Sequence, residues 1–464
     1  LHAEVVVLGS GPGGYTAAFR AADLGKQVVL IERYSTLGGV CLNVGCIPSK
    51  ALLHTAKVIT EAEETAHHGV TFSAPNVDLE QLRNWKANDV VGKLTAGLSS
   101  MAKQRAVTVV QGLGKFTGPN QITVTAADGK VTEYSADHII IATGARSREL
   151  PNLPQDGKKI IGYREAMTLP KQPKSLIVVG SGAIGVEFAY FYATMGTKVT
   201  IVEFMPNIVP VEDEEVSKQL EKSLKKIGIE IMTEASVESV DTKGDGCKAT
   251  VKTKTGTVTL DAEIVLSAVG IEANISGLGL ETVGIATDKG KIVVDKYYAT
   301  NVPGYYAIGD CVPGQALAHV ASAEGITCVE KIAGVHTEPI DYNNIPGCTY
   351  CQPEVASVGM TEKQAKEKGY TLKVGKFPFS ASGKASASGA KDGFIKLIFD
   401  AKYGEFLGAH MIGAGVTELI AEVVVARKLE TTHHEILNAI HPHPTMSEAV
   451  MEAVADAYGE VIHL

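Results

Sequence analysis

Two cysteines, Cys41 and Cys46, are the residues whose type and spacing most strongly suggest chemistry. In a regular helix the rise over five residues would separate their Cα atoms by at least ~7.5 Å, whereas a disulfide needs roughly 4.4–6.8 Å. If the two sulfurs bond, the segment must therefore form a distorted turn. Gly38, Gly39 and Gly45 supply the backbone freedom that such a turn needs.

The residues around the two cysteines favour a redox pair over a metal site. Pro48 suits the first turn of a regular helix, which would place Cys46 near the positive end of that helix and favour a thiolate. A zinc site would need two further ligands, and no partner pair has clear zinc spacing. We interpret the remaining cysteines as buried thiols rather than as a second redox centre; they are Cys247, Cys311, Cys328, Cys348 and Cys351.

A histidine and a carboxylate near the end of the chain form a candidate acid–base pair. Attack of a dithiol on a disulfide needs a thiolate, and hence a base. Histidine side chains titrate near neutral pH, so His443 can act as the base. A hydrogen bond to Glu448 could fix which ring nitrogen of His443 carries the proton. Glu448 also completes the capping pattern Thr445-x-x-Glu448 ahead of an apolar helix, and the two roles can coexist.

An internal duplication predicts the elements that position these residues. Glu4–Arg33 and Ser175–Phe204 both show a β-branched run, a glycine-rich turn, a helix and a second strand that ends in glutamate. Corresponding residues are offset by one constant number of positions: Gly9, Gly11, Gly14 and Glu32 in the first copy, and Gly180, Gly182, Gly185 and Glu203 in the second. Each copy is therefore predicted to be a βαβ unit.

The glycine spacing suits a dinucleotide. The first glycine makes the turn, the second lets the backbone approach a pyrophosphate, and the third lets helix and strand pack closely. The helix N-terminus then binds the phosphates, and the glutamate at the end of the second strand accepts hydrogen bonds from the ribose hydroxyls. A single match is often only a turn, but two matches in register predict two dinucleotide sites. Phe204 and Met205 follow Glu203 with no cation for a 2′-phosphate, which favours NAD over NADP.

The length and composition of the chain exclude several classes of protein. The 464 residues predict about three domains, and 45% hydrophobic with 20% charged residues excludes a disordered chain. No apolar run reaches the ~18 residues of a membrane helix, and the chain runs straight into a strand, so we expect no signal peptide. A net charge of −9 argues against nucleic acid as the main partner. Seven cysteines are too few for a secreted disulfide scaffold and indicate a cytosolic-type compartment.

The motif GGVCLNVGCIPSK, together with the two glycine-rich turns, resembles the flavin-dependent pyridine nucleotide–disulfide oxidoreductases. The resemblance spans essentially the whole chain, and within the family it is strongest to members that oxidise protein-bound dihydrolipoyl groups with NAD⁺. Further matching segments are Ile139–Ser147, Tyr306–Cys311, Leu317–Gly325 and His441–Glu448.

The resemblance implies an α/β fold with two Rossmann-like domains and a C-terminal α+β dimerisation domain. The expected boundaries are 1–147 and 271–340 for a discontinuous FAD domain, 148–270 for an NAD domain and 341–464 for the interface domain. FAD would be held by Gly9, Gly11, Gly14, Glu32, Lys50, Gly114, Thr143, Gly144, Asp310 and Ala318. NAD would be held by Gly180, Gly182, Ile184, Gly185, Glu203, Val237 and Gly270. No metal site is expected.

The resemblance also assigns catalytic roles. Cys41 would face the substrate and Cys46 the flavin, while Lys50 and Glu187 would form an ion pair beside the flavin. The alternative for that pair is an exposed lysine and a helix-surface glutamate, both commonplace.

His443 would be the base, supported by Glu448 and by His441, with a cis peptide at His443–Pro444. The protein would be an obligate homodimer in which His443 reaches the disulfide of the other subunit.

The implied partners are lipoyl domains of acyltransferase or carrier proteins and the peripheral subunit-binding domain of a complex core. They belong to 2-oxo acid dehydrogenase or glycine cleavage complexes, in the cytoplasm or in the mitochondrial matrix. Glutathione- or mercury-reductase-type activity is the alternative, which Glu203, the Ile-Pro-Ser after Cys46 and the lack of a C-terminal cysteine pair disfavour. A mainly structural docking subunit is the alternative from another class.

One segment departs from the family pattern Gly-Arg-x-Pro-Asn. Here Gly270 is followed by Ile271, Glu272, Ala273 and Asn274, so no arginine contact is expected there.

Overall fold

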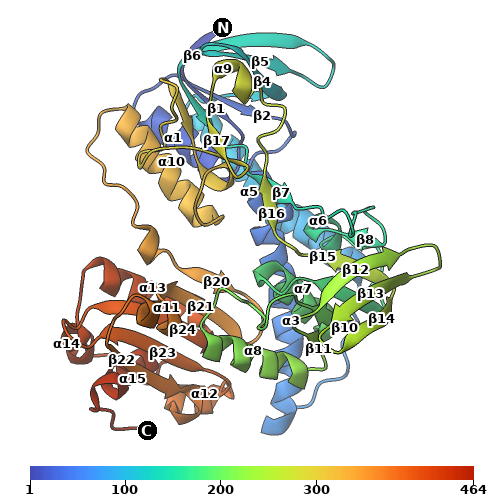
Figure 1. Ribbon diagram of the computed structural model, residues 1–464, viewed down its shortest axis with the longest axis vertical. Coiled ribbons are helices and arrows are strands. Elements are labelled where there is room, and N and C mark those ends of the chain that lie inside the picture. Colours follow the sequence, from blue (N-terminus) through green and yellow to red (C-terminus); the bar gives the residue numbers. More distant parts are fainter. The chain divides into compact units, whose positions relative to one another are not determined.

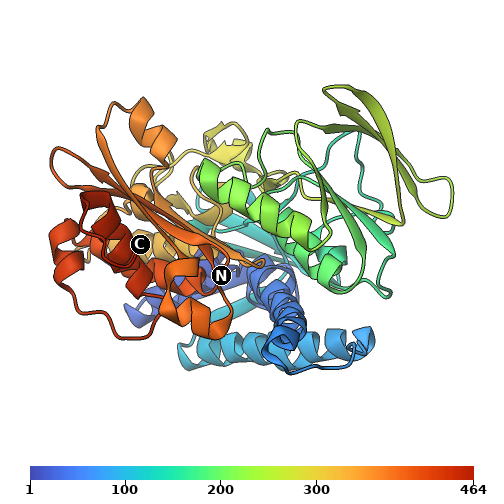
Figure 2. The ribbon, with the colours of Figure 1, turned by 90° about the horizontal axis from the view of Figure 1, so that it is seen from below.

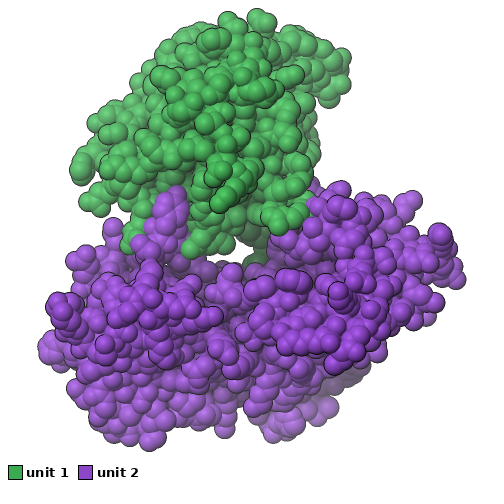
Figure 3. Space-filling view, in the orientation of Figure 1, with its two compact units in different colours: residues 1–51, 80–148, 271–341 green, residues 52–79, 149–270, 342–464 purple.

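The computed structural model describes residues 1–464 (Figure 1). Contacts within the chain divide it into two compact units, coloured separately in Figure 3. Unit 1 comprises Leu1–Ala51, Glu80–Arg148 and Ile271–Asp341. Unit 2 comprises Leu52–Leu79, Glu149–Gly270 and Tyr342–Leu464. The expected separation of residues 148–270 from residues 341–464 into two domains stays a prediction.

Unit 1 is built around a seven-stranded sheet in the order β3-β2-β1-β6-β5-β4, with β19 also pairing with β6. β1, β2, β3, β6 and β19 run parallel, while β4 and β5 extend the sheet in antiparallel fashion. The strands are β1 (His2–Leu8), β2 (Val28–Glu32), β3 (Thr108–Gln111), β4 (Leu113–Gly118), β5 (Gln121–Thr125), β6 (Val131–Ile141) and β19 (Tyr305–Ala307). The β-branched residues of the central strands β1 and β2, and of the end of β6, are buried on both faces, as a covered parallel sheet requires.

Helices and short strands complete unit 1. α1 (Pro12–Asp23) packs against α10 (Ala318–Ile332). The remaining helices are α2 (Gly39–Val44), α4 (Leu79–Trp85), a π-helix (Lys86–Gly92), α5 (Lys93–Gln104), α9 (Leu280–Val283) and a 3₁₀ turn (Gly309–Cys311). The two-stranded pairs are β7 (Ala145–Ser147) with β16 (Ile271–Ala273), and β17 (Thr287–Asp288) with β18 (Lys291–Ile292). α3 (Cys46–Glu64) begins in unit 1 and continues into unit 2.

The first half of unit 2 repeats the arrangement around β1. Its parallel sheet has the order β11-β10-β9-β15-β8, and a separate meander has the order β12-β13-β14. The strands are β8 (Ile160–Ile161), β9 (Ser175–Val179), β10 (Lys198–Val202), β11 (Glu230–Met232), β12 (Ser236–Asp241), β13 (Cys247–Thr253), β14 (Gly256–Ala262) and β15 (Ile264–Ser267). The helices are α6 (Tyr163–Ala166), α7 (Ala183–Thr194) and α8 (Glu214–Lys226).

The second half of unit 2 is an antiparallel sheet of order β20-β21-β24-β23-β22, with α13 and α15 packed on it (Figure 2). Its strands are β20 (Gly347–Thr349), β21 (Glu354–Gly359), β22 (Leu372–Pro378), β23 (Phe394–Asp400) and β24 (Phe406–Gly413). Its helices are α11 (Glu362–Glu367), α12 (Gly383–Ser388), α13 (Val416–Lys428), α14 (His433–Asn438) and α15 (Glu448–Tyr458). The predicted α/β class with a C-terminal α+β region is confirmed.

No helix of the structure combines the length and the apolar character needed to cross a membrane.

Candidate active site

The first glycine-rich turn connects β1 to α1. Gly9 has φ of +101°, and a Cβ there would overlap the carbonyl oxygen of Ala142. A Cβ on Gly14 would overlap the carbonyl oxygen of Gly9. At Gly11, by contrast, the nearest atom to a Cβ is 4.0 Å away. The outer glycines thus serve the turn and its packing, while the middle one leaves backbone that a pyrophosphate could approach, so the turn fits a dinucleotide.

The second turn, between β9 and α7, has the same geometry. A Cβ on Gly180 would come 2.5 Å from the carbonyl oxygen of Ala268, and one on Gly185 would overlap the carbonyl oxygen of Gly180. Nothing lies within 4 Å of a Cβ on Gly182. This second cradle therefore fits a dinucleotide for the same steric reason as the first.

The terminal glutamate of each copy is buried and holds its own turn. Glu32 accepts hydrogen bonds from Ser10 N at 2.9 Å, Ser10 Oγ at 2.6 Å and Tyr34 N at 2.9 Å. Because an ionised carboxylate offers about four acceptor positions, capacity remains for a ribose hydroxyl.

Glu203 makes the equivalent contacts: Ser181 N at 2.7 Å, Ser181 Oγ at 2.6 Å and Met205 N at 2.7 Å. Sequence reasoning missed Ser10 and Ser181, although both occur in a repeated Gly-Ser-Gly that could have indicated them.

The cysteine segment is the distorted turn that bonding between the two sulfurs would require. α2 ends at Val44 and α3 begins at Cys46, and Gly45 between them has non-helical angles of φ −137° and ψ −120°. A Cβ at residue 45 would lie 3.0 Å from the Cα of Cys41. Glycine therefore lets the chain turn back onto Cys41.

The two cysteines are thiols in this structure and hydrogen-bond to each other. That hydrogen bond is the first reason why the pKa of Cys41 is raised, and burial is the second. The nearby Lys50 ammonium opposes the rise. The geometry brings the two sulfurs together as a dithiol that can interconvert with a disulfide.

The cysteine segment packs against the first cradle. Gly38 N donates to the carbonyl oxygen of Ser10 at 2.9 Å, and a Cβ on Gly39 would lie 2.5 Å from the Cα of Gly11. The structure therefore places the dithiol next to the turn that would bind the pyrophosphate of a dinucleotide.

Three other residues expected at the first dinucleotide follow β6 or β19 closely in the chain, and a fourth, Ala318, begins α10. Thr143 and Gly144 follow β6, and Gly144 has φ of +67°. Asp310 lies in the 3₁₀ turn, where burial raises the pKa of its carboxyl and Lys291 opposes the rise.

Gly114 has a packing explanation of its own. A Cβ on this residue of β4 would lie 2.6 Å from Cδ1 of Leu8 and 3.0 Å from Cδ1 of Ile122, so a larger residue would displace the ends of these two core side chains. No contact of Gly114 in the structure points to a dinucleotide role, which stays a prediction.

In unit 2, Glu187 is buried on α7 and its Oε1 accepts the backbone N–H of Tyr350 at 2.9 Å. It is therefore not the surface glutamate of the alternative interpretation. Lys50 belongs to unit 1, and its pairing with Glu187 stays a prediction. Ile184 lies in the first turn of α7 with 38% of its surface exposed.

Val237 and Gly270 are two further residues predicted at the NAD site. Val237 is buried in the core of the β12–β13–β14 region, and its carbonyl oxygen accepts Asn152 Nδ2 at 2.6 Å. Gly270 has φ of +105°, which explains a glycine at the end of this segment. Contact of either residue with NAD stays a prediction.

The distal acid–base pair forms within unit 2. His443 Nδ1 lies 2.8 Å from Glu448 Oε1, and Glu448 Oε2 accepts the N–H of Thr445 at 2.8 Å. Burial would raise the pKa of Glu448, but the Thr445 amide and the His443 ring outweigh it, so the pKa is lowered.

Only the glutamate half of the predicted capping box forms, because the Thr445 hydroxyl donates to the carbonyl oxygen of Pro442. The His443–Pro444 peptide is cis, as predicted.

A second histidine–carboxylate pair lies beside the first. His441 Nε2 is 2.8 Å from Glu422 Oε1, and its Nδ1 is 2.9 Å from the carbonyl oxygen of Ala439. Glu422 Oε2 accepts Ser447 Oγ at 2.8 Å. Sequence reasoning missed Glu422 because it lies on α13, with no local signal linking it to His441.

Two further expectations concern the segment after Gly270 and the cysteines outside the Cys41–Cys46 pair. The segment at Ile271–Ala273 lacks the family arginine, but it forms β16, where Glu272 pairs with Arg146 at 2.8 Å. Cys348, predicted to be a buried thiol, is only partly buried, because it lies on β20 at the edge of its sheet. The other four predicted thiols are buried: Cys247, Cys311, Cys328 and Cys351.

Comparison with known proteins gives matches along most of the chain. Residues 3–325 match the model of the pyridine nucleotide-disulphide oxidoreductase family, and residues 345–454 match the dimerisation domain of that family. A dihydrolipoyl dehydrogenase of Zymomonas mobilis is 47% identical over 464 residues, covering 100% of this chain and 99% of the relative.

A mitochondrial dihydrolipoyl dehydrogenase of Arabidopsis thaliana is 44% identical over 465 residues, covering 99% of this chain and 91% of the relative. The crystal structure of LpdA from Mycobacterium tuberculosis is similar with a TM-score of 0.91 at 30% identity, covering 97% of this chain and 99% of that one.

Proposed function

Because the chain belongs to the pyridine nucleotide–disulphide oxidoreductases, we propose that it is a dihydrolipoyl dehydrogenase that oxidises protein-bound dihydrolipoyl groups and reduces NAD⁺. The observation that carries the proposal is the dithiol segment packed on the first of two equivalent dinucleotide cradles. A thiol–disulfide couple thus lies next to one cofactor site, while a second site remains for the final electron acceptor.

The residues that would hold each cofactor follow from the two cradles. FAD would bind along Gly9, Gly11, Gly14 and Glu32, with Lys50, Gly114, Thr143, Gly144, Asp310 and Ala318 around it. NAD would bind along Gly180, Gly182, Gly185 and Glu203, with Ile184, Val237 and Gly270 around it. When bound, FAD supplies two-electron transfer between the dithiol and NAD⁺.

The cysteines carry the thiol–disulfide exchange. The substrate thiolate attacks the sulfur of Cys41 in the Cys41–Cys46 disulfide, and Cys46 leaves as a thiolate. The second substrate thiol then loses its proton and displaces Cys41, so that the substrate leaves as a disulfide and the enzyme holds two reduced cysteines. Two electrons have passed from the substrate to the cysteine pair.

His443 supplies the base for these proton transfers. Because Glu448 contacts Nδ1 of His443 at 2.8 Å, the proton of the neutral ring is held on Nδ1 and Nε2 is left to accept the proton of a substrate thiol. The His443 side chain is 77% exposed, so it is accessible to a group that lies outside its own unit.

We further propose that the protein is an obligate homodimer in which His443 serves the cysteine pair of the other subunit. The match of residues 345–454 to a dimerisation domain supports the dimer. Mixing inactive Cys41→Ser and His443→Gln homodimers tests the sharing, because a mixed dimer would regain one intact site. If subunit exchange occurs without any regain of activity, each site belongs to a single chain.

The expected partners are lipoyl domains of acyltransferase or carrier proteins and the peripheral subunit-binding domain of a complex core. Relatives include bacterial proteins and a mitochondrial protein, which supports a location in the cytoplasm or in the mitochondrial matrix.

An anaerobic assay tests the proposed function. Purified protein is mixed with dihydrolipoamide and NAD⁺, and in parallel with NADP⁺, while absorbance of the reduced nicotinamide is followed. Fast formation of NADH with little NADPH is expected. If neither forms, while NADPH is oxidised by glutathione disulfide, the substrate assignment is wrong.

A further inference from the structure

A row of polar side chains crosses the C-terminal sheet of unit 2. Ser357 on β21 is paired with His410 on β24, His410 with Lys396 on β23, and Lys396 with Lys376 on β22. Residues directly opposite in paired strands share one face of a sheet, so the four side chains line up across it. The neighbours of Lys396 and His410 along their strands, such as Leu397 and Ala409, belong to the apolar core on the other face.

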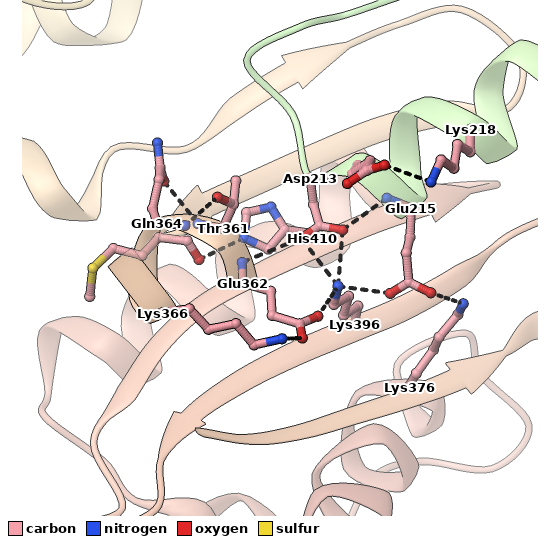
Figure 4. A network of polar contacts seen from close by, with 12 residues as sticks. Asp213, Glu215, Lys218, Thr361, Glu362, Gln364, Lys366, Lys376, Lys396 and His410 are labelled. Carbon is pink, nitrogen blue, oxygen red and sulfur yellow. Dashed lines mark hydrogen bonds and ion pairs between the residues drawn. The ribbon is translucent and has the colours of Figure 1, made fainter. Parts of the chain in front are cut away.

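The acidic start of α8 lies over this row (Figure 4). Lys396 Nζ is 3.0 Å from Asp213 Oδ1, 2.7 Å from Glu215 Oε2 and 2.6 Å from Glu362 Oε2. Lys376 also contacts Glu215, at 2.8 Å. Lys396 and Lys376 of the C-terminal sheet thus hold the start of α8, which belongs to the segment that follows the second cradle and its Glu203.

Lys396 is the centre of these contacts. Its side chain is only 2% exposed. A charge can be buried to this extent because three carboxylates pair with it. Burial would lower the pKa of Lys396, but hydrogen bonds to Glu215 and Glu362 outweigh it and keep the ammonium charged. His410 does not compete for the carboxylates, because burial lowers the pKa of its ring, whose Nε2 bonds to the carbonyl oxygen of Met360 at 2.8 Å.

The same segment leads back to the second cradle through Val209. Val209 is buried and has φ of +39°, a conformation that is strained for a β-branched residue. Its N–H donates to the carbonyl oxygen of Ser181 at 3.0 Å, and its carbonyl oxygen accepts the N–H of Glu212 at 2.9 Å. Ser181 in turn binds Glu203 through its N–H and hydroxyl.

We propose that Lys396 is a positioning residue for the NAD site: by holding Asp213 and Glu215, it keeps Val209 in its strained conformation against Ser181 and so fixes the second cradle. Such strain persists only where the surrounding structure holds the residue in that conformation. The ion cluster around the buried Lys396 and Asp213 is the feature that does so here. The proposal rests on the assignment of the second cradle to NAD.

Lys396→Met tests the proposal, because methionine keeps much of the aliphatic length but removes the charge. The flavin and the cysteine pair are first reduced under anaerobic conditions, so that NADH binds without passing electrons to them. Affinity for NADH, measured by fluorescence titration of this reduced FAD-loaded protein, is expected to fall roughly tenfold, within the usual range of coupling between sites. The rate of flavin reduction by dihydrolipoamide should stay unchanged, because that half-reaction uses the first cradle. Wild-type affinity in the folded variant, or equal loss in both half-reactions, would overturn the proposal.

A second variant covers the case in which Lys396→Met does not fold. Asp213 caps α8 by accepting the N–H of Glu215 at 3.1 Å, and asparagine caps helices equally well. Asp213→Asn should therefore keep the helix while weakening the attraction to Lys396, and NADH affinity should fall in the same direction. Unchanged affinity in Asp213→Asn would contradict the proposal.

A matched control and a rescue separate positioning from general stability. Lys218→Met removes an exposed lysine of α8 whose ion pair is with Glu214, in the preceding turn of the helix, and NADH affinity should not change. In Lys396→Met/Val209→Gly, glycine adopts the positive φ without strain, so NADH affinity should partly return. If the glycine leaves the affinity of Lys396→Met unchanged or lowers it further, strain at Val209 does not carry the effect of Lys396 and the proposal is wrong.

The controls also distinguish this proposal from the proposed function. A wild-type protein that binds no NADH would refute the assignment of the second cradle itself. A wild-type protein that binds NADH normally, with Lys396→Met binding it equally well, would refute only the role of Lys396.

Discussion

The backbone of Gly45 approaches Cys41 so closely that a Cβ at residue 45 would lie 3.0 Å from the Cα of Cys41 and 2.8 Å from the carbonyl oxygen of Val40. The closeness of the two cysteines therefore depends on a residue that takes no part in the chemistry.

Gly45→Ala should hinder formation of the Cys41–Cys46 disulfide, because the added methyl group pushes the two helices α2 and α3 apart. We expect dihydrolipoamide oxidation to fall at least roughly tenfold, as a displacement of about 1 Å at reacting groups costs up to about a hundredfold. Titration of free thiols in the air-oxidised protein measures the effect directly. Gly97→Ala is the control, since nothing lies within 4 Å of a Cβ there; equal activity of the two variants would contradict the explanation.

The third glycines of the two cradles allow the two cofactor sites to be separated. A Cβ on Gly14 or on Gly185 would overlap the carbonyl oxygen of the first glycine in the same turn. Gly14→Ala should abolish the yellow colour of bound flavin. Gly185→Ala should retain the colour and flavin reduction by dihydrolipoamide, but lose NADH formation. Loss of flavin from Gly185→Ala and not from Gly14→Ala would reverse the assignment of the cradles.

Glu448→Gln should impair proton transfer more than it disturbs the fold. Glutamine can still accept the hydrogen bond from the Thr445 amide. The substitution removes the negative charge that keeps the proton of the neutral His443 ring on Nδ1. General acid–base catalysis contributes typically 10²–10⁴-fold, so we expect kcat/KM for dihydrolipoamide to fall by about a hundredfold. The melting temperature should change little. Activity close to wild type would show that Glu448 serves mainly as a helix cap.

Phe204 offers a test of nucleotide preference. It is exposed, follows Glu203 directly and stands where NADP-dependent relatives of this fold place a cation. Phe204→Arg should raise the ratio of kcat/KM for NADP⁺ over NAD⁺ by roughly tenfold, since a charge-assisted hydrogen bond contributes about 1.5–3 kcal/mol. Glu203 stays in place because it holds Ser181. Phe204→Leu is the control, and an equal change in both variants would contradict the charge explanation.

Glu212 predicts a pH dependence of stability. Burial raises the pKa of its carboxyl from 4.5 to about 7, with the Asp213 charge adding to the rise and a hydrogen bond from Ser357 opposing it. Because the folded state binds this proton more tightly than the unfolded state, the associated stability is present below about pH 4.5 and is lost as the pH rises through about 7.

Glu212→Gln, which stays neutral, should therefore be more stable than wild type at pH 8, by about 3 kcal/mol, with little difference at pH 4.5. Thermal melts across this pH range check the expectation. A difference that is constant with pH would mean that Glu212 does not titrate between the two states.

The sequence alone determined the features that depend on local backbone sterics. The spacing of Gly9, Gly11 and Gly14 and its copy at Gly180 indicated two cradles, because only glycine permits those turns and close approaches. The glycines beside Cys41 and Cys46 indicated the distorted turn in the same way. A pair five residues apart, His443 and Glu448, was also within reach of local reasoning.

Only the tertiary structure decided which distant side chains meet. Glu422 on α13 contacts His441, Glu272 pairs with Arg146, and Lys396 pairs with carboxylates from two other segments. No local pattern encodes such contacts, because each partner taken alone looks like an ordinary surface charge. Packing of the sheets and helices brings them together. Where the charge is buried, as at Lys396 with 2% of its side chain exposed, desolvation then requires that the charge be paired.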